Sequence, residues 1–295
     1  MPSIEERMKE QIGELQGQLQ DYIDRLDAPK TLKDSMLYSL QSGGKRIRPL
    51  LLFATLEAFR KDWRAGLPVA CAVEMIHTYS LIHDDLPCMD DDDLRRGKPT
   101  NHKVFGEAVA VLAGDALLTY SFQILSDAPP ALLDDRKKIL IISELARAAG
   151  PEGMVAGQTL DMEAEDRRIS LAELESIHLH KTGKLISFCV KAGAILADAD
   201  EKTQAKLSEF ARRIGLAFQI RDDILDIVGK AEILGKNVGS DQSKKKSTYP
   251  ALLSLEGADK KLEETIFAAK TILRELPLET SSLERITEQI WKREN

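Results

Sequence analysis

Apolar residues recur at steps of three and four along most of the chain, which is the spacing of one face of an α-helix. One early stripe consists of Ile12, Leu15, Leu19, Tyr22, Ile23 and Leu26. Further stripes of this spacing occupy residues 69–80, 104–122 and 207–218. Strict alternation of apolar and polar residues, which marks a half-buried strand, is absent over any useful length. The pattern therefore predicts a chain that is helical throughout.

Helix-breaking residues divide the stripes into about ten predicted helices joined by short loops. The breakers lie at 42–44, 66–68, 128–130 and 150–151, and at Gly229. Since no shift in composition marks a boundary, we expect residues 1–295 to form one large all-α domain. The segment 229–250 shows little periodicity, and a connection of that length in a compact domain is usually functional or mobile.

Composition supports the helical prediction and excludes several classes of protein. Hydrophobic residues make up 43% of the chain and charged residues 30%, which is too apolar for a disordered protein. The net charge of −7 argues against nucleic acid as the main partner. No run reaches the ~18 uninterrupted apolar residues of a membrane-spanning helix, so we expect no membrane insertion. The N-terminus lacks a signal peptide pattern and the three cysteines fit no disulfide framework, which predicts a cytoplasmic protein.

The acidic residues are unevenly spread, because six aspartates fall within ten positions. They are Asp84, Asp85, Asp90, Asp91, Asp92 and Asp93. Carboxylates this close raise one another's pKa unless cations neutralise them, and all-oxygen sites suit Mg²⁺. Arg95 and Arg96 follow directly, and guanidinium groups bind phosphate oxygens. A solvated acidic loop is the alternative, but Asp84 continues the apolar stripe of residues 69–80 and is expected to point inward.

A second aspartate cluster lies late in the chain. Asp222 and Asp226 are four residues apart and project from one helix face, with Asp223 beside them. They continue the apolar stripe of residues 207–218, where a carboxylate is costly to desolvate unless a metal or partner compensates. The alternative is an acidic pair on a helix surface. Together the two clusters are interpreted as facing walls of one cavity.

Cationic segments complete the candidate chemistry. The segment 43–49 combines glycines, Lys45, Arg48 and a proline suited to a helix start, where an anion is favoured. Lys181 with Thr182, and the lysines between 236 and 246, add further cations. An ordinary loop with a helix cap and a solvated lysine surface are the alternatives. With no nucleophile arrangement in the sequence, these residues favour metal-assisted departure of a diphosphate.

In combination and order these segments resemble the trans-isoprenyl diphosphate synthases, and among them the bacterial short-chain members that make farnesyl diphosphate. The similarity covers residues 30–290 and rests on 43–49, 84–96, 181–183, 218–226 and 246–250. It implies an all-α bundle around a central cavity. It also implies a head-to-tail 1′-4 condensation of isopentenyl diphosphate with dimethylallyl or geranyl diphosphate, catalysed by a homodimer.

The resemblance further implies a role for each motif position. Three Mg²⁺ ions, with Mn²⁺ as an alternative, are expected at Asp84, Asp85, Asp90, Asp222, Asp223 and Asp226. The allylic diphosphate is expected at Arg95, Lys181, Thr182, Gln219, Lys236 and Lys246. Isopentenyl diphosphate is expected at Lys45, Arg48, His77 and Arg96. Without its motif position, His77 would be interpreted as a packed helix histidine.

Product length is expected to depend on the bulk beneath the first aspartate motif, at Tyr79 and Ser80. Tyr79 precedes Asp84 by five residues, or about 7.5 Å of helix. An aromatic residue there resembles farnesyl rather than geranylgeranyl synthases, although a simple core position is the alternative. The two extra residues within the motif, including Pro87, resemble bacterial farnesyl synthases and also plant-type geranylgeranyl synthases. A geranylgeranyl or geranyl diphosphate synthase of the same family is therefore an alternative. A class I terpene cyclase and a non-catalytic synthase subunit are the remaining alternatives.

Overall fold

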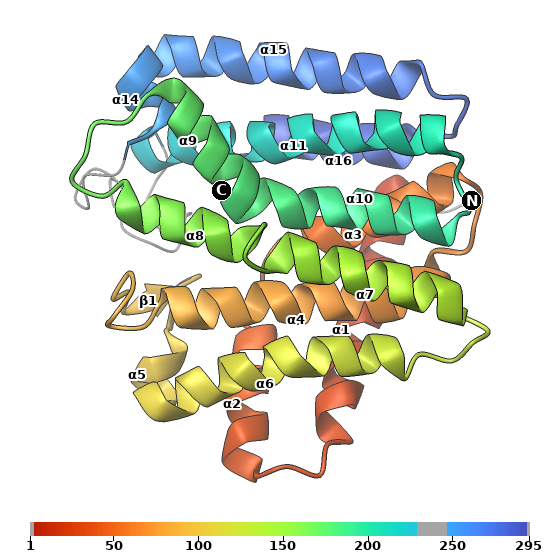
Figure 1. The fold of residues 1–295 in the computed structure, drawn as a ribbon, viewed down its shortest axis with the longest axis vertical. Coiled ribbons are helices and arrows are strands. Elements are labelled where there is room, and N and C mark those ends of the chain that lie inside the picture. The colour runs from red at the N-terminus through yellow and green to blue at the C-terminus, as the bar shows by residue number, and fades with distance from the viewer. Residues whose placement is uncertain (1–2, 229–246, 294–295) are drawn as a thin grey trace.

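The computed structural model describes residues 3–228 and 247–293, and most of them lie in α-helices stacked side by side (Figure 1). The predicted all-α bundle is confirmed. The described residues contain more α-helices than the ten expected, because short helices such as α5 and α14 escape a periodicity search. They also contain one small antiparallel hairpin, β1 (Leu94–Arg95) with β2 (Lys98–Pro99), which the sequence pattern does not predict.

The helices follow one another in chain order with short connections. The first half contains α1 (Ile4–Asp24), α2 (Lys30–Leu40), α3 (Ile47–Ala58), α4 (Leu67–Asp84), α5 (Asn101–Phe105), α6 (Glu107–Ser126) and α7 (Asp135–Ala149). The second half contains α8 (Met154–Glu163), α9 (Leu171–His178), α10 (Lys184–Leu196), α11 (Glu201–Val228), α14 (Tyr249–Leu253), α15 (Leu255–Arg274) and α16 (Ser281–Trp291). A 3₁₀ turn, η1 (Trp63–Gly66), precedes α4, and a π-helical turn, η2 (Leu179–Gly183), joins α9 to α10.

Helix α4 is the core helix of the first half. It packs against α2, α3 and α6, and twelve of its eighteen residues are buried. Its sequence is apolar on nearly every face, which suits a helix surrounded by others. Its burial explains why the stripe of residues 69–80 leads directly toward an inward-pointing aspartate.

Two helices are long and apolar enough to cross a membrane by length and composition alone. They are α4 with the turn before it, Trp63–Asp84, and α6, Glu107–Ser126. The sequence analysis did not find them because Glu74 and Asp115 interrupt the apolar runs. The apolar window of the first is 72% buried inside the bundle, as in the core helix of a soluble protein. The window of α6 is 39% buried.

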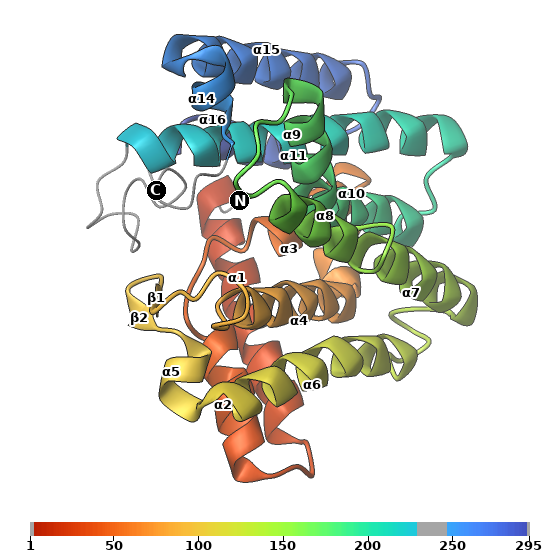
Figure 2. The same cartoon turned by 60° about the vertical axis from the view of Figure 1, so that its left-hand side comes forward.

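The direction of the helices brings the motif-bearing segments together. The C-terminal ends of α4, α8 and α11 lie at the same end of the bundle, near the β1–β2 hairpin (Figures 1 and 2). Both aspartate motifs sit at such C-terminal ends. The described fold is therefore consistent with the two facing walls, whereas the division of residues 1–295 into a single domain stays a prediction.

Candidate active site

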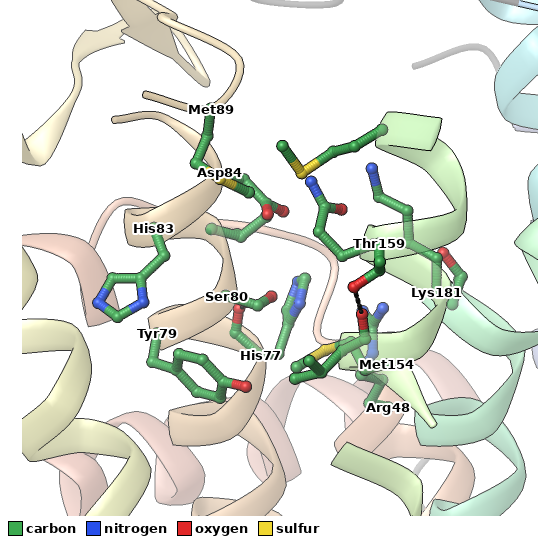
Figure 3. Close-up of a pocket in the computed structure, with 15 residues that line it drawn as sticks. Arg48, His77, Tyr79, Ser80, His83, Asp84, Met89, Met154, Thr159 and Lys181 are labelled. Carbon is green, nitrogen blue, oxygen red and sulfur yellow. Dashed lines mark hydrogen bonds between the residues drawn. The ribbon is translucent and has the colours of Figure 1, made fainter. Parts of the chain in front are cut away.

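A cavity of about 310 Å³ lies where α4, α8 and η2 come together. Figure 3 shows side chains from these helices directed toward it. Its lining consists of Arg48, His77, Tyr79, Ser80, Leu81, His83, Asp84, Met89, Met154, Val155, Gln158, Thr159, Met162, Lys181 and Thr182. Those expected from the sequence are Arg48, His77, Tyr79, Ser80, Asp84, Lys181 and Thr182. The fold thus brings predicted residues from three separate segments into this cavity.

The α8 wall of the cavity is the part that sequence reasoning missed. It contributes Met154, Val155, Gln158, Thr159 and Met162. These side chains are uncharged and belong to no phosphate-binding or metal-binding pattern. Their helical spacing was the only signal, and it does not distinguish a cavity wall from a packed core.

Asp84 ends helix α4 and points into the cavity (Figure 3). Burial raises the pKa of this carboxyl group to about 6, although Lys181 and Arg95 act to lower it. The backbone N–H of Asp90 donates to the Asp84 carbonyl oxygen at 2.8 Å. This turn folds the chain back, so that the third aspartate of the motif lies beside the first. A divalent cation bound between the two carboxylates would relieve the repulsion between them.

Asp85, in contrast, forms an ion pair with another side chain of the protein. Its side chain is buried, with 3% of the residue exposed, and it accepts hydrogen bonds from Arg95. Nε of Arg95 lies 2.7 Å from Oδ1 and 2.9 Å from Oδ2. Arg95 also lies 3.6 Å from Asp92. Asp85 therefore fixes the guanidinium group of Arg95 close enough to Asp84 to lower the pKa of that carboxyl group.

The second motif, at the end of α11, also combines a partly exposed aspartate with a buried one. The side chain of Asp222 is 43% exposed and forms an ion pair with Arg293. Asp223 is buried, and its Oδ2 accepts the backbone N–H of Tyr249 at 2.9 Å. Asp226 is also buried. One aspartate of the pair thus faces outward and its neighbour is used within the fold.

A polar chain links Asp223 to Gln219. Nε2 of His178 lies 3.4 Å from Asp223 Oδ2, and Nδ1 of His178 lies 3.4 Å from the Gln219 amide nitrogen. These contacts fit an imidazole that donates to the carboxylate and accepts from the amide. The ring of Tyr249 stacks on His178 with centroids 5.7 Å apart. His178 was not predicted, because nothing in its local sequence reveals a partner so far along the chain.

Arg293 is a second residue that sequence reasoning missed. Its guanidinium group lies 4.5 Å from the ring centroid of Phe218 and pairs with Asp222. The side chain of Arg221 donates to the Arg293 carbonyl oxygen at 2.8 Å, which fixes the end of the chain against α11. No motif surrounds this arginine in the sequence, so only the fold reveals its place beside the second aspartate motif.

The cations expected to bind isopentenyl diphosphate surround the start of α3. Arg46 has a left-handed backbone (φ 52°) and forms a buried ion pair with Glu74. The Arg96 guanidinium donates to the carbonyl oxygen of Gly43. Burial lowers the pKa of Lys45, with Arg293 and Arg96 acting in the same direction. Burial also lowers the pKa of Arg48.

The same region holds a neutral histidine and an unpaired donor. Burial and four nearby arginines lower the pKa of His77 well below its usual range. Nε of Arg48 is buried and has no hydrogen-bond partner among the described residues. Several positively charged side chains lie together here, and one of them has a buried N–H without a hydrogen-bond partner. This arrangement favours a site that binds a polyanionic ligand over a purely structural cluster.

Lys181 and Thr182 lie in the π-helical turn η2, a distortion that often marks a functional segment. Helix α8 approaches this turn closely at Gly157, because a methyl group there would lie 2.5 Å from Lys181 Cα. Nζ of Lys181 lies 2.7 Å from Oδ2 of Asp161 on α8. The glycine and the acid together fix the lysine opposite Asp84.

Comparison with known proteins assigns this arrangement to a family. The polyprenyl synthetase family matches residues 29–287. The farnesyl diphosphate synthase of Geobacillus stearothermophilus is 56% identical over 293 residues, covering 99% of each chain. That of Bacillus subtilis (strain 168) is 58% identical over 281 residues, covering 95% of each chain. The chain belongs to the polyprenyl synthetase family.

A solved structure agrees with this assignment. The geranyltransferase of Helicobacter pylori, complexed with magnesium and isoprenyl diphosphate, is 34% identical with a TM-score of 0.81 and covers 93% of each chain. As a member of the polyprenyl synthetase family, the protein is a prenyltransferase. The predicted family, fold class and enzyme class are therefore confirmed, whereas the roles of single residues stay predictions.

The carboxylates of this site suit a metal ion that is bound jointly by the protein and by a substrate. Among the described residues, no group of three or more His, Cys, Asp or Glu side chains is arranged to hold a metal ion. Mg²⁺ is typically bound by one or two carboxylates together with substrate phosphates. Asp84, with its raised pKa and the neighbouring Asp90, offers such a partial site.

Two predicted allylic-site lysines of this polyprenyl synthetase, Lys236 and Lys246, lie outside the described residues.

Proposed function

We propose that this prenyltransferase condenses isopentenyl diphosphate with dimethylallyl and geranyl diphosphate to give farnesyl diphosphate. The observation that carries the proposal is the cavity, which has a carboxylate at its mouth, cations on two sides and Tyr79 near its base. Its charged lining residues Arg48, Asp84 and Lys181 suit metal-bound diphosphate, and its methionines suit a growing prenyl chain. The farnesyl diphosphate synthases that are 56% and 58% identical support this product.

The allylic diphosphate is proposed to bind between the two aspartate motifs. Arg95, held by Asp85, and Lys181, held by Asp161, would bind its oxygens, together with Thr182, Gln219, Lys236 and Lys246. Three Mg²⁺ ions at Asp84, Asp90 and Asp222, with Mn²⁺ as an alternative, would supply electrostatic stabilisation of the departing diphosphate. Asp85, Asp223 and Asp226 would act on these ions through coordinated water or through their neighbours.

Isopentenyl diphosphate is proposed to bind at the start of α3. Lys45, Arg48 and Arg96 would hold its diphosphate, and the neutral imidazole of His77 would donate a hydrogen bond. This places its alkene toward the allylic carbon in the cavity. Orientation of two bound substrates supplies much of the rate enhancement in such a reaction.

The reaction then needs charge stabilisation and exclusion of water. The allylic carbon–oxygen bond breaks, the alkene attacks the resulting cation, and a proton leaves to the released diphosphate. The methionines and Tyr79 that line the cavity would keep water from the cation. No side-chain base is required by this scheme.

An assay with isopentenyl diphosphate and each allylic primer tests the proposal. We expect farnesyl diphosphate as the main product, formed from either primer, with activity lost on chelation and restored by Mg²⁺. A main product of geranyl or geranylgeranyl diphosphate would favour the alternatives within the family. Cyclic products without isopentenyl diphosphate would indicate a terpene cyclase, and no turnover would indicate a non-catalytic subunit.

Chain length provides a separate prediction. Tyr79→Ala should shift the product from farnesyl toward geranylgeranyl diphosphate and longer chains, because the ring occupies the base of the cavity. The change in discrimination should be roughly tenfold or more, as for other apolar pockets enlarged by several carbons. Chromatography of the dephosphorylated products measures it. An unchanged product distribution would contradict the role of Tyr79.

We further infer that the enzyme is a cytoplasmic homodimer that binds neither nucleic acid nor membrane. The support for a second copy is the exposed apolar surface of α6, where Val111 and Leu112 are 38% and 58% exposed. Light scattering coupled to size-exclusion chromatography measures the mass directly. Charged substitutions at these two positions should convert the dimer to a monomer.

A further inference from the structure

Tyr79 at the base of the cavity has a support behind it that no motif contains. The ring of His83 meets the ring of Tyr79 edge-on, with centroids 5.7 Å apart and an interplanar angle of 79°. Both residues belong to α4, one helical turn apart. Both residues line the cavity, and in Figure 3 the imidazole lies at the left of the view while the phenol points along the base.

The other side of the imidazole is fixed by helix α6. Nε2 of His83 lies 3.1 Å from the carbonyl oxygen of Val111 and 4.0 Å from Oδ1 of Asp115. The carbonyl can only accept, so Nε2–H donates to it. The side chain of His83 therefore bridges from Tyr79 to the backbone of the neighbouring helix.

Gly114 on α6 makes room for this bridge. A methyl group at Gly114 would lie 2.5 Å from Cδ2 and 2.9 Å from Cε1 of His83, and closer still to Nε2. Such distances are far below van der Waals contact, so any larger residue must displace the imidazole. The same ring contacts Tyr79 edge-on, so in a closely packed interior a displaced imidazole is expected to displace the phenol as well.

We propose that Gly114 and His83 set the product length by fixing how far the Tyr79 ring enters the cavity. This inference rests on the proposed synthase function and goes beyond it, because that proposal gives neither Gly114 nor His83 a role. Both are positioning residues that act through Tyr79. Bulk added behind the ring pushes it into the cavity and shortens the product, and bulk removed lets it retreat and lengthens the product.

Two opposite substitutions test this line of contacts. Gly114→Ala should raise the ratio of geranyl to farnesyl diphosphate, because the imidazole and phenol are driven toward the substrate. His83→Ala should raise the ratio of geranylgeranyl to farnesyl diphosphate, because the ring loses its support. Each product ratio should change roughly tenfold, which is the discrimination that one or a few carbon atoms produce in an apolar pocket.

The double variant and a matched control make the readout specific. In Gly114→Ala/His83→Ala the new methyl group partly fills the space of the lost imidazole, so the product distribution should return toward farnesyl diphosphate. Gly17→Ala is the same change on the exposed side of α1, where a methyl group would meet no atom within 4 Å. It should leave the product distribution as in the wild type. Loss of folding in one variant leaves the other as an independent test.

The outcomes separate the inference from the function on which it rests. If Tyr79→Ala lengthens the product while both His83→Ala and Gly114→Ala retain the wild-type distribution, the support is wrong and the role of Tyr79 stands. If Tyr79→Ala also leaves product length unchanged, the role of Tyr79 fails and this inference fails with it. Shifts of the same direction in both single variants would also overturn it, since volume added and volume removed must act oppositely.

Discussion

The two aspartate motifs carry the same pair of adjacent acids, yet the fold holds them by different means. In the first motif, Asp85 is paired with Arg95, which lies ten residues further along the chain. In the second, Asp223 is held by His178 and by the backbone of Tyr249, both remote in sequence. Asp84 lines the cavity, whereas Asp222 pairs with Arg293 near the end of the chain.

This difference shows that the first motif is a largely self-contained unit and the second is not. The acid, its turn and its arginine all lie within residues 84–96, so the segment supplies the partner of its own buried carboxylate. The second motif depends on contacts from α9, α14 and the C-terminal segment. In both motifs the second aspartate is buried and accepts hydrogen bonds from the protein, whereas the first is partly exposed.

The largest expected effect is that of Asp84→Asn. Removing this charge should lower kcat roughly 10³-fold, because several kcal/mol of metal-assisted stabilisation would be weakened. The melting temperature should not fall, since the change removes a buried charge. Steady-state kinetics at saturating Mg²⁺ and calorimetry measure the two quantities. A loss of less than tenfold would contradict the assignment of Asp84 to the metal-facing wall.

A smaller effect is expected for Asp85→Asn. The amide cannot form the two-oxygen contact with Arg95, so kcat/KM for the allylic primer should fall about 10- to 100-fold, the usual cost of losing a supporting partner. The KM for isopentenyl diphosphate should change little. Asp93→Asn is the matched control, because Asp93 is exposed and pairs with Lys103 away from the cavity. An equal effect on both substrates would indicate a direct metal ligand instead.

Asp223→Ala should mainly affect stability. It leaves the buried N–H of Tyr249 without its acceptor, which costs about 1–3 kcal/mol of the free energy of unfolding. Asp223→Asn retains an acceptor oxygen and should restore most of that loss. Urea unfolding of the two variants gives the comparison. If Asp223→Asn were as stable as the wild type but as inactive as Asp84→Asn, Asp223 would have to bind metal directly.

A last effect concerns stability alone, which should depend on pH. Burial raises the pKa of Asp84 to about 6 in the folded protein, so between pH about 4 and 6 the folded state binds the proton more strongly than the unfolded chain. The contribution of Asp84 to the free energy of unfolding therefore decreases as pH rises through this range. In chelator, Asp84→Asn should be more stable than the wild type above pH 6 and equal to it near pH 4. A difference that grows toward low pH would have the wrong sign.

The parts that the sequence predicted share a common physical basis. Helices follow from the local spacing of apolar residues, and the inward direction of Asp84 follows from its place on that spacing. The α8 wall and Arg293 lack such a signal. The sequence pattern of uncharged residues, or of an isolated arginine, is the same whether the side chains line a cavity or lie on the protein surface. The β1–β2 hairpin is too short for any alternating pattern to appear.

The sequence by itself determined that the chain is helical, that it carries two aspartate clusters with cations suited to diphosphates, and which family it resembles. The tertiary structure decided that Asp84 lines the cavity while Asp85 binds Arg95, that Asp223 accepts the backbone N–H of Tyr249, and how His83 fits against Gly114 and Tyr79. The reason is the range of the interactions. Helical periodicity acts over four residues, whereas ion pairs and close helix packing depend on segments that only folding brings together.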